Sequence, residues 1–255
     1  MEKDGFKPKV QALSKGLDIL ECFTNAKDEI GIMEISERLD LPESTVYRMV
    51  TTLDDKGYLV QNLETKKYKL GLHLLKINEK SSELNDEVEV ITKYMTELNE
   101  KFNETTNFAI RVNDKAVYLK KIDSKHILRP AFTGRDIYPC YCTSLGKSLV
   151  LDMTKKELNE IFASTFEQLT EKTILTKEDL LEDLRVAKER GYTVDNEEFN
   201  LGIKCFSVPV RAESLGGRII GAISMPVPTI RLDGEREEKI KEALLDMAIR
   251  IKKDL

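Results

Sequence analysis

The chain has 255 residues, of which 41% are hydrophobic and 33% charged, and its formal net charge is −5. This length is enough for two modest domains with hydrophobic cores, and the composition is that of a soluble globular protein. No hydrophobic run approaches the about 20 residues that span a bilayer, and the N-terminus has no hydrophobic signal core, so a cytoplasmic protein without membrane contacts is expected.

The first part of the chain shows a helix and then a pair of short helices. Residues 1–10 are expected to form an arm, after which a first helix begins. The apolar face of this helix is expected to consist of Leu13, Leu17, Ile19 and Leu20. Residues 31–58 contain two helical patterns separated by a Leu-Pro break, and Gly57 ends the second. This arrangement predicts a helix-turn-helix.

The outward face of the second helix of this pair carries short hydroxyls, a phenol and a guanidinium rather than Glu and Lys. If Val46 and Val50 face the core, a rotation of about 100° per residue places the polar set outward. Such groups suit hydrogen bonding to base edges and phosphates in a DNA major groove. A solvated helix face rich in threonine is the alternative, and the preceding helix and turn favour DNA. The residues expected to contact DNA from this helix are Ser44, Thr45, Tyr47, Arg48, Thr51 and Thr52.

Two strand patterns, residues 58–61 and 67–70, follow directly and predict a β-hairpin that forms the wing of a winged helix. Residues 1–70 carry slightly more acidic than basic residues, so the position of the positive charges matters more than their sum. Lys66 and Lys67 on the hairpin are expected to contact DNA. Residues 1–70 are therefore expected to form a DNA-binding domain.

A linker helix is expected over residues 71–85 and a second domain over residues 86–255. Amphipathic spacing over residues 83–102 predicts a long helix at the start of this domain. Strand and helix patterns then alternate, which predicts an antiparallel α+β domain. The expected strands are residues 107–112, 116–122, 127–132, 192–194, 203–210 and 218–225. The expected helices begin near Ser144, Thr154, Thr176 and Glu235.

Three N-terminal segments resemble the winged helix-turn-helix of the IclR family of bacterial transcriptional regulators. They read SKGLDILECF, MEISERLDLPESTVYRMVTTLDDKGYLVQN and KKYKLGLHLL. Two further segments, TGRDIYPCYCTSLGKSL and LRVAKERGYTVDNEEFNLGIKCFSVPV, resemble the effector domain of that family, which has a GAF-like fold. Tyr141 and Cys142 stand where relatives often have a His-Ala pair, and this departure bears on the identity of the ligand.

The resemblance implies a pocket that senses a small organic acid. From the residues alone, Thr143 and Ser144 at a helix start either cap the helix or offer donors to a carboxylate. Asp195 and Glu198 are either polar partners of a ligand hydroxyl or surface charges. The residues expected to bind the effector are Thr133, Gly134, Tyr141, Cys142, Thr143, Ser144, Asp195, Glu198, Cys205 and Ser224.

An enzyme or metal site is the hypothesis to test against this one. Cys140, Cys142 and Cys205 with the nearby acids form a conceivable metal or nucleophile site. However, the chain contains only two histidines and lacks HExxH, GxSxG, the phosphate-binding loop motif and paired CxxC spacing. Four scattered cysteines also do not make a disulfide framework. No catalytic residue, metal or cofactor is therefore expected.

The leading hypothesis combines these residues with the resemblance: a ligand-responsive transcriptional regulator, a repressor of a catabolic operon, that binds a pseudo-palindromic double-stranded DNA operator. A dimer or a dimer of dimers is expected, because a two-fold symmetric protein matches a two-fold symmetric site. The alternative is a metabolite-binding module or enzyme whose winged helix mediates protein contacts. A gel shift with genomic fragments separates the two hypotheses.

Overall fold

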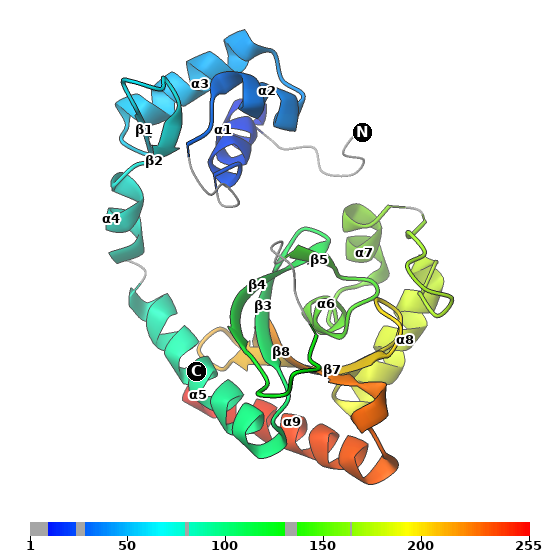
Figure 1. The fold of residues 1–255 in the computed structure, drawn as a ribbon. Helices are drawn as coiled ribbons and strands as arrows, with labels where there is room; N and C mark the ends of the chain where they lie inside the picture. Colours follow the sequence, from blue (N-terminus) through cyan, green and yellow to red (C-terminus); the bar gives the residue numbers. More distant parts are fainter. Residues whose placement is uncertain (1–9, 24–28, 80–81, 131–136, 164) are drawn as a thin grey trace. The chain divides into compact units, whose positions relative to one another are not determined.

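The computed structural model divides the chain into two compact units, residues 7–85 and residues 86–255, which are considered one at a time (Figure 1). The residues that the structure describes are 10–23, 29–79, 82–130, 137–163 and 165–255. Within these ranges, no helix is both long enough and apolar enough to cross a membrane.

The first unit contains the expected winged helix-turn-helix. Its helices α1 (Gln11–Glu21), α2 (Ile32–Leu39) and α3 (Glu43–Asp55) pack around a small hydrophobic core. Its strands β1 (Leu59–Gln61) and β2 (Tyr68–Leu70) pair antiparallel and form the wing. Between α2 and α3 the backbone of Asp40 is left-handed, with φ 52°, and Gly57 after α3 has φ 75°. These two positions let the chain reverse direction within a few residues.

The predicted apolar face of α1 is only partly correct. Ile19 is fully buried in the core, but Leu13 and Leu17 are 63% and 53% exposed. Their side chains lie along an apolar groove of about 840 Å³ between α1, α3 and the short helix α4 (His73–Glu79). The helix carries apolar side chains on two sides, and the core of this unit covers only the side of Ile19. Periodicity therefore identified apolar surface without separating core from groove.

The second unit is built on an antiparallel sheet whose strand order, over its described residues, is β5-β4-β3-β8-β7-β6 (Figure 1). The central strands β3 (Thr106–Val112) and β8 (Arg218–Pro228) pair directly. The remaining strands are β4 (Lys115–Ile122), β5 (Ile137–Pro139), β6 (Thr193–Asn196) and β7 (Ile203–Ala212). The predicted antiparallel α+β fold is confirmed for this domain.

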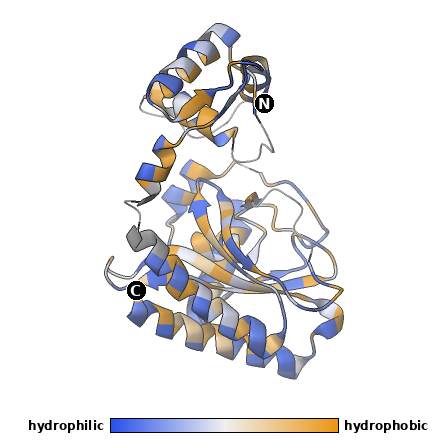
Figure 2. Ribbon diagram, turned by 60° about the vertical axis from the view of Figure 1, so that its left-hand side comes forward, coloured by the Kyte–Doolittle hydropathy of each residue, from blue (hydrophilic) through white to orange (hydrophobic). Residues whose placement is uncertain are grey.

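Helices cover both faces of the sheet because strand side chains alternate between faces. Phe108 and Ile223 face a core that includes α5 (Ser82–Phe102) and α9 (Gly234–Asp254). Ala109 and Ala222 face a second core, to which three other helices contribute. These helices are α6 (Ser144–Leu149), α7 (Lys155–Ile161) and α8 (Lys177–Arg190). Figure 2 shows hydrophobic and hydrophilic residues alternating along α9, as expected for a helix with one buried side.

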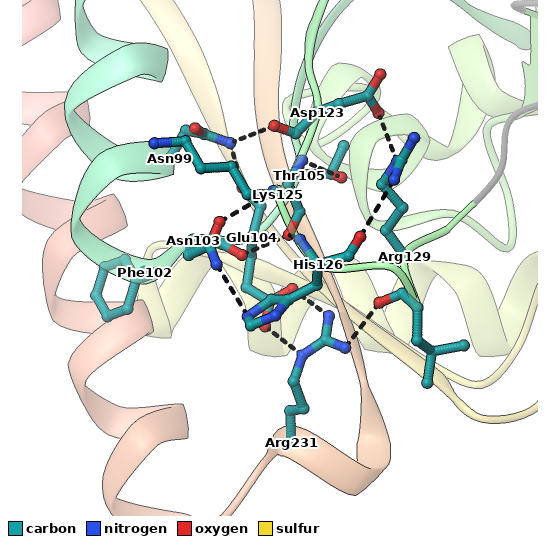
Figure 3. A network of polar contacts seen from close by, with 12 residues as sticks. Asn99, Phe102, Asn103, Glu104, Thr105, Asp123, Lys125, His126, Arg129 and Arg231 are labelled. Carbon is teal, nitrogen blue, oxygen red and sulfur yellow. Dashed lines mark hydrogen bonds and ion pairs between the residues drawn. The ribbon is translucent and has the colours of Figure 1, made fainter.

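The strand predicted at residues 127–132 is wrong for its described part, residues 127–130, and residues 131–132 lie outside the described ranges. β5 pairs with β4 instead. Pro130 lacks the N–H that a paired strand needs, and the preceding residues are held by side-chain hydrogen bonds. Figure 3 shows this network, in which Arg231 binds the Glu104 carboxylate. Arg231 also donates to the Leu128 carbonyl at 2.8 Å.

Candidate functional site

The outward surface of α3 is polar and free of acidic residues between Ser44 and Thr52. The exposed members of the predicted DNA-contacting set are Ser44, Tyr47, Arg48 and Thr52, and the half-buried members are Thr45 and Thr51. The hydroxyls of Thr51 and Thr52 donate to backbone carbonyls of α3 at 2.8 Å, which leaves their oxygens as acceptors. Arg48 and Tyr47 are thus the long side chains that reach outward from this surface.

The wing places two lysines at the surface of the same unit. Lys66 and Lys67 are exposed at the end of the hairpin loop. Asn62 and Thr65 hold this loop, since both donate hydrogen bonds to the Glu29 carboxylate, at 2.8 and 2.7 Å. These bonds, first that from Thr65, hold the pKa of Glu29 below its ordinary value. The loop geometry leaves both ammonium groups available to an anionic partner.

A cavity of about 540 Å³ lies in the second unit, on the sheet face that α6 covers. Five of the residues predicted to bind an effector line it: Thr143, Ser144, Asp195, Cys205 and Ser224. The lining residues that sequence reasoning missed are Asn107, Tyr118, Pro130, Tyr138, Leu145, Phe199, Asn200, Leu201, Ile203 and Pro226. Aromatic and aliphatic walls with a few polar groups are typical of small-molecule sites.

Other predicted effector residues do not line this cavity. The Tyr141 hydroxyl donates to the Glu167 carbonyl at 2.8 Å, and the ring of Tyr141 stacks on Phe166 at 4.3 Å. Cys142 is fully buried, and the Glu198 carboxylate turns to a buried lysine. Thr133 and Gly134 lie outside the described residues. Tyr141, Cys142 and Glu198 therefore support the neighbours of the cavity rather than its wall.

The start of α6 is shaped by one threonine and one glycine. The Thr143 hydroxyl donates to the Pro139 carbonyl at 2.7 Å and accepts from the Gly146 N–H at 3.1 Å, so it caps the helix as the sequence indicated. A Cβ on Gly146 would lie 2.2 Å from the Cα of Cys140. Only glycine allows α6 to approach the preceding loop this closely, and this contact places Ser144 at the cavity wall.

Charged groups are buried directly behind the cavity. The Lys147 ammonium on α6 lies 2.7 Å from Glu198 and 2.9 Å from Asp183. Burial alone would lower the pKa of Lys147, but these two carboxylates outweigh it and raise that pKa above its ordinary value. The backbone N–H of Glu198 in turn donates to Asp195 at 2.7 Å. Lys147 thus connects α6 and α8 with the segment that carries Glu198, directly after β6, although nothing in its local sequence marked it.

Asp195 differs from an ordinary surface carboxylate. Burial raises the pKa of Asp195 to about 7, and the neighbouring Glu198 carboxylate adds to this effect. The N–H groups of Glu198 and Phe199 and the Lys147 ammonium act in the opposite direction and do not cancel it. Near neutral pH, Asp195 can therefore accept a hydrogen bond when ionised or donate one when protonated.

This pKa predicts how an Asp195→Asn variant responds to pH. Between about pH 4 and pH 7 the folded state holds a proton that the unfolded state releases, so this group destabilises the fold increasingly as the pH rises. The variant lacks this ionisation. Its free energy of unfolding relative to the natural chain should therefore be higher at pH 8 than at pH 5. The rise should be roughly 1.4 kcal/mol for each pH unit up to about pH 7, where Asp195 ionises in the folded state.

Chemical denaturation at the two pH values measures this change. Asp152→Asn provides the control, because the hydrogen bond from Arg211 lowers the pKa of Asp152, so its titration lies below both pH values. The difference between that variant and the natural chain should be the same at pH 5 and pH 8. A flat profile for Asp195→Asn would show that Asp195 is ionised throughout.

The cysteines near the cavity have the properties of neutral thiols. Burial raises the pKa of Cys140, Cys142 and Cys205, and nearby Asp195 raises that of Cys205 further. Over the part of the chain that the structure describes, no group of three His, Cys, Asp or Glu residues is arranged to hold a metal ion. A protonated thiol is a weak ligand and a weak nucleophile, so these residues act here through shape and weak hydrogen bonding.

Comparisons with known proteins find matches for both units of the chain. The model of the IclR helix-turn-helix domain matches residues 12–63, and that of the bacterial transcriptional regulator IclR C-terminal domain matches residues 83–253. The HTH-type transcriptional regulator KdgR of Escherichia coli (strain K12) is 33% identical over 228 residues, which cover 89% of this chain and 86% of that protein.

Two further relatives are similar over nearly the whole chain. The HTH-type transcriptional repressor AllR of Escherichia coli (strain K12) is 29% identical over 239 residues, which cover 93% of this chain and 88% of that protein. A solved structure of an IclR homolog from Microbacterium hydrocarbonoxydans, complexed with 4-hydroxybenzoate, has a TM-score of 0.76 at 22% identity and covers 96% of this chain and 98% of its own. This second likeness establishes a shared fold.

Proposed function

The chain belongs to the IclR family of bacterial transcriptional regulators, and from this premise we propose that it is a cytoplasmic repressor without enzymatic activity. Residues 1–70 bind a double-stranded DNA operator, residues 71–85 connect the domains, and residues 86–255 bind a small effector. The observation that carries this proposal is the acid-free surface of α3 with Arg48 and Tyr47 outward. The wing lysines support it.

The first test is operator binding. A gel shift of the full chain with fragments of the host genome, repeated at several salt concentrations, should reveal a specific site whose affinity falls as salt rises. Footprinting should then show two half-sites about one helical turn apart, or a multiple of it. Failure to bind any fragment would instead favour a metabolite-binding module whose winged helix contacts proteins.

Arg48→Ala and Lys67→Ala should weaken operator binding in two different ways. Loss of the Arg48 guanidinium is expected to cost about 1–3 kcal/mol and to relax the preference at one base pair of each half-site. Loss of the Lys67 ammonium should weaken binding to all sequences and reduce the salt dependence. Selection of bound sequences from a random library, done with each variant, measures both effects. If the folded Arg48→Ala variant kept the preference at this base pair, α3 would not read that base through Arg48.

We also propose that the α1 and α4 sides of this groove form the contact between two copies of the first unit, whereas its α3 side, which carries Arg48 and Thr52, stays available to DNA. Leu13 and Leu17 are more exposed than their neighbours in the core, and Ile77 is 47% exposed along the same groove. An apolar surface of this kind is typical of an association site. A second copy fits because a two-fold operator requires paired winged helices.

A Leu13→Glu, Leu17→Glu double variant should therefore dissociate the dimer. We expect a loss of about 2–4 kcal/mol in association, seen as a monomer in analytical ultracentrifugation, together with loss of operator binding at dilute protein. Met33→Glu is the matched control, because Met33 is 65% exposed on α2 and does not line the groove. A dimer that survives the double change but not the control would place the contact on α2 instead.

We propose that the effector occupies the cavity under α6 and is a small organic acid. Five residues that the sequence assigned to effector binding meet there, and polar groups lie among aromatic walls as in other ligand sites. A ligand changes operator affinity only if it binds the DNA-competent and DNA-incompetent states differently, by typically about 1–3 kcal/mol. Thermal-shift screening of organic acids on the full chain, followed by operator binding with each hit, tests this role.

A further inference from the structure

A row of polar side chains crosses the sheet on the face that α6 covers. Asn107 on β3 pairs in register with Ser224 on β8, Ser224 pairs with Ser207 on β7, and Ser207 pairs with Thr193 on β6. Residues directly opposite each other on neighbouring strands project from the same face. All four side chains are at most 2% exposed. The row is thus a polar layer within the interior of the domain.

At the Thr193 end of this row the side chains have hydrogen-bond partners, whereas Asn107 and Ser207 lack them among the described residues. The Thr193 hydroxyl donates to the Ser144 carbonyl and pairs with the Ser148 hydroxyl, both at 2.7 Å. By contrast, neither Nδ2 nor Oδ1 of Asn107 has a hydrogen-bond partner among the described residues, and the same holds for Oγ of Ser207. A buried amide without partners costs free energy on folding, so each such group calls for an explanation, and a functional role is one of them.

The two unsatisfied side chains differ in their position relative to the cavity. Asn107 forms part of the cavity wall together with Ser144, Ser224 and Asp195, whereas Ser207 does not line it. We propose that Asn107 is the specificity-determining residue of the effector cavity. It selects ligands that carry a hydroxyl or N–H donor beside a carbonyl or carboxylate acceptor. This inference rests on the proposed effector role of the cavity.

The chemistry of the amide gives this selectivity. A primary amide presents donors at Nδ2 and an acceptor at Oδ1, side by side. A plain carboxylate has only acceptors, so it satisfies Nδ2 and leaves Oδ1 unpaired, whereas a hydroxylated acid satisfies both atoms of Asn107. Analogues that leave a buried polar group unpaired are rejected strongly.

The rest of the wall favours the same class of ligand. Asp195 accepts from a second hydroxyl when ionised, and the hydroxyls of Ser144 and Ser224 serve as donors or acceptors. Among the described lining residues there is no Lys, Arg or His to neutralise a ligand that presents charge alone. A volume of about 540 Å³ accommodates an acid of several carbons. The fitting class is therefore hydroxylated carboxylic acids rather than alkyl carboxylates.

The test uses the full chain and pairs of acids with equal carbon number: glycolate with acetate, glycerate with propionate, and gluconate with hexanoate. Calorimetric titration should show that the natural chain binds one or more hydroxylated members at least on the order of tenfold more tightly than their partners. Asn107→Leu should abolish this preference and weaken binding of the hydroxylated acid by a similar factor. It should also leave the free energy of unfolding unchanged or raise it, because it removes an unpaired buried amide.

Two further variants separate selectivity from structure. Ser207→Ala, which removes the other unpaired group of the row, should match the stability behaviour of Asn107→Leu and keep the preference for hydroxylated acids. Asn107→Ser, which keeps a hydroxyl in the wall, should restore part of the preference.

The outcomes also separate this inference from the proposed function. The inference would be overturned if Asn107→Leu lost stability but kept the preference for hydroxylated acids. It would also be overturned if no hydroxylated acid bound the natural chain more tightly than its unsubstituted partner. Control by an effector could still stand in both cases. If no acid in the panel bound the natural chain or changed its operator affinity, the proposed sensing of an organic acid would fail and the inference with it.

Discussion

Replacing Lys147 with Met is expected to cost about 3–5 kcal/mol of the free energy of unfolding, as when one partner of a buried ion pair is removed. The Lys147 side chain has no exposed surface, and Glu198, one of its two carboxylate partners, is only 9% exposed. Met fills a similar volume but leaves Glu198 and Asp183 without a cation. Chemical denaturation of the full chain measures the loss.

The loss should be larger at pH 8 than at pH 5. Burial already raises the pKa of Glu198, and Lys147 is the main opposing influence, so its removal raises that pKa further. A protonated Glu198 tolerates burial, and the penalty therefore shrinks as the pH falls. Arg185→Met is the control, since Arg185 pairs with Glu182 and Glu189 on an exposed side of α8 and should change stability little. Equal effects of both substitutions would contradict this account.

Lys147 also illustrates where prediction from the sequence ends. The TSLGK segment predicted the start of α6, because Thr143 caps the helix and the periodic residues follow it. The ion pairs of Lys147 depend on Asp183 and Glu198, which lie 36 and 51 positions further along the chain. No local pattern marks such a meeting. A lysine in a helix is usually exposed, so its burial becomes visible only in the fold.

The winged helix was predictable because its signals are local. The break at Pro42, the stop at Gly57 and the short strand patterns each act within a few residues. The exposure of Leu13 and Leu17 was not, because it depends on which sides of α1 the other elements cover. The same limit explains the strand wrongly predicted at residues 127–132, where the apolar pattern is that of a strand and hydrogen bonds from distant residues decide the outcome.

The cavity was predicted only in part for the same reason. Ser144, Asp195 and Cys205 were found through segments that resemble a family. Asn107 was missed because its importance follows from the register of β3 against β8, which places it beside Ser224 under α6. One signal in the sequence was available: an asparagine directly precedes the apolar run of residues 108–110 within this strand. A polar residue in such a buried strand must either find a partner or serve a ligand.

Replacing Glu104 with Leu is expected to lower the free energy of unfolding by an amount near the lower end of the about 3–5 kcal/mol for broken buried pairs. The Glu104 side chain has no exposed surface and accepts hydrogen bonds from Arg231 and Arg236, as Figure 3 shows for Arg231. The two guanidinium groups are 18% and 31% exposed, so water relieves part of their loss. Arg231 also holds the Leu128 carbonyl, two residues before Pro130 in the cavity wall.

The Glu104 variant should therefore lose affinity for the effector as well as stability. Denaturation measures the loss of stability. Titration with the effector, at a temperature where the variant is folded, measures the loss of affinity. Glu97→Gln is the matched control: Glu97 pairs with Arg250 on the surface of α5, both side chains are more than 40% exposed, and its loss should stay within about 1 kcal/mol. If Glu104→Leu lowered stability yet bound the effector as tightly as the control, the wall at Pro130 would not depend on this ion pair.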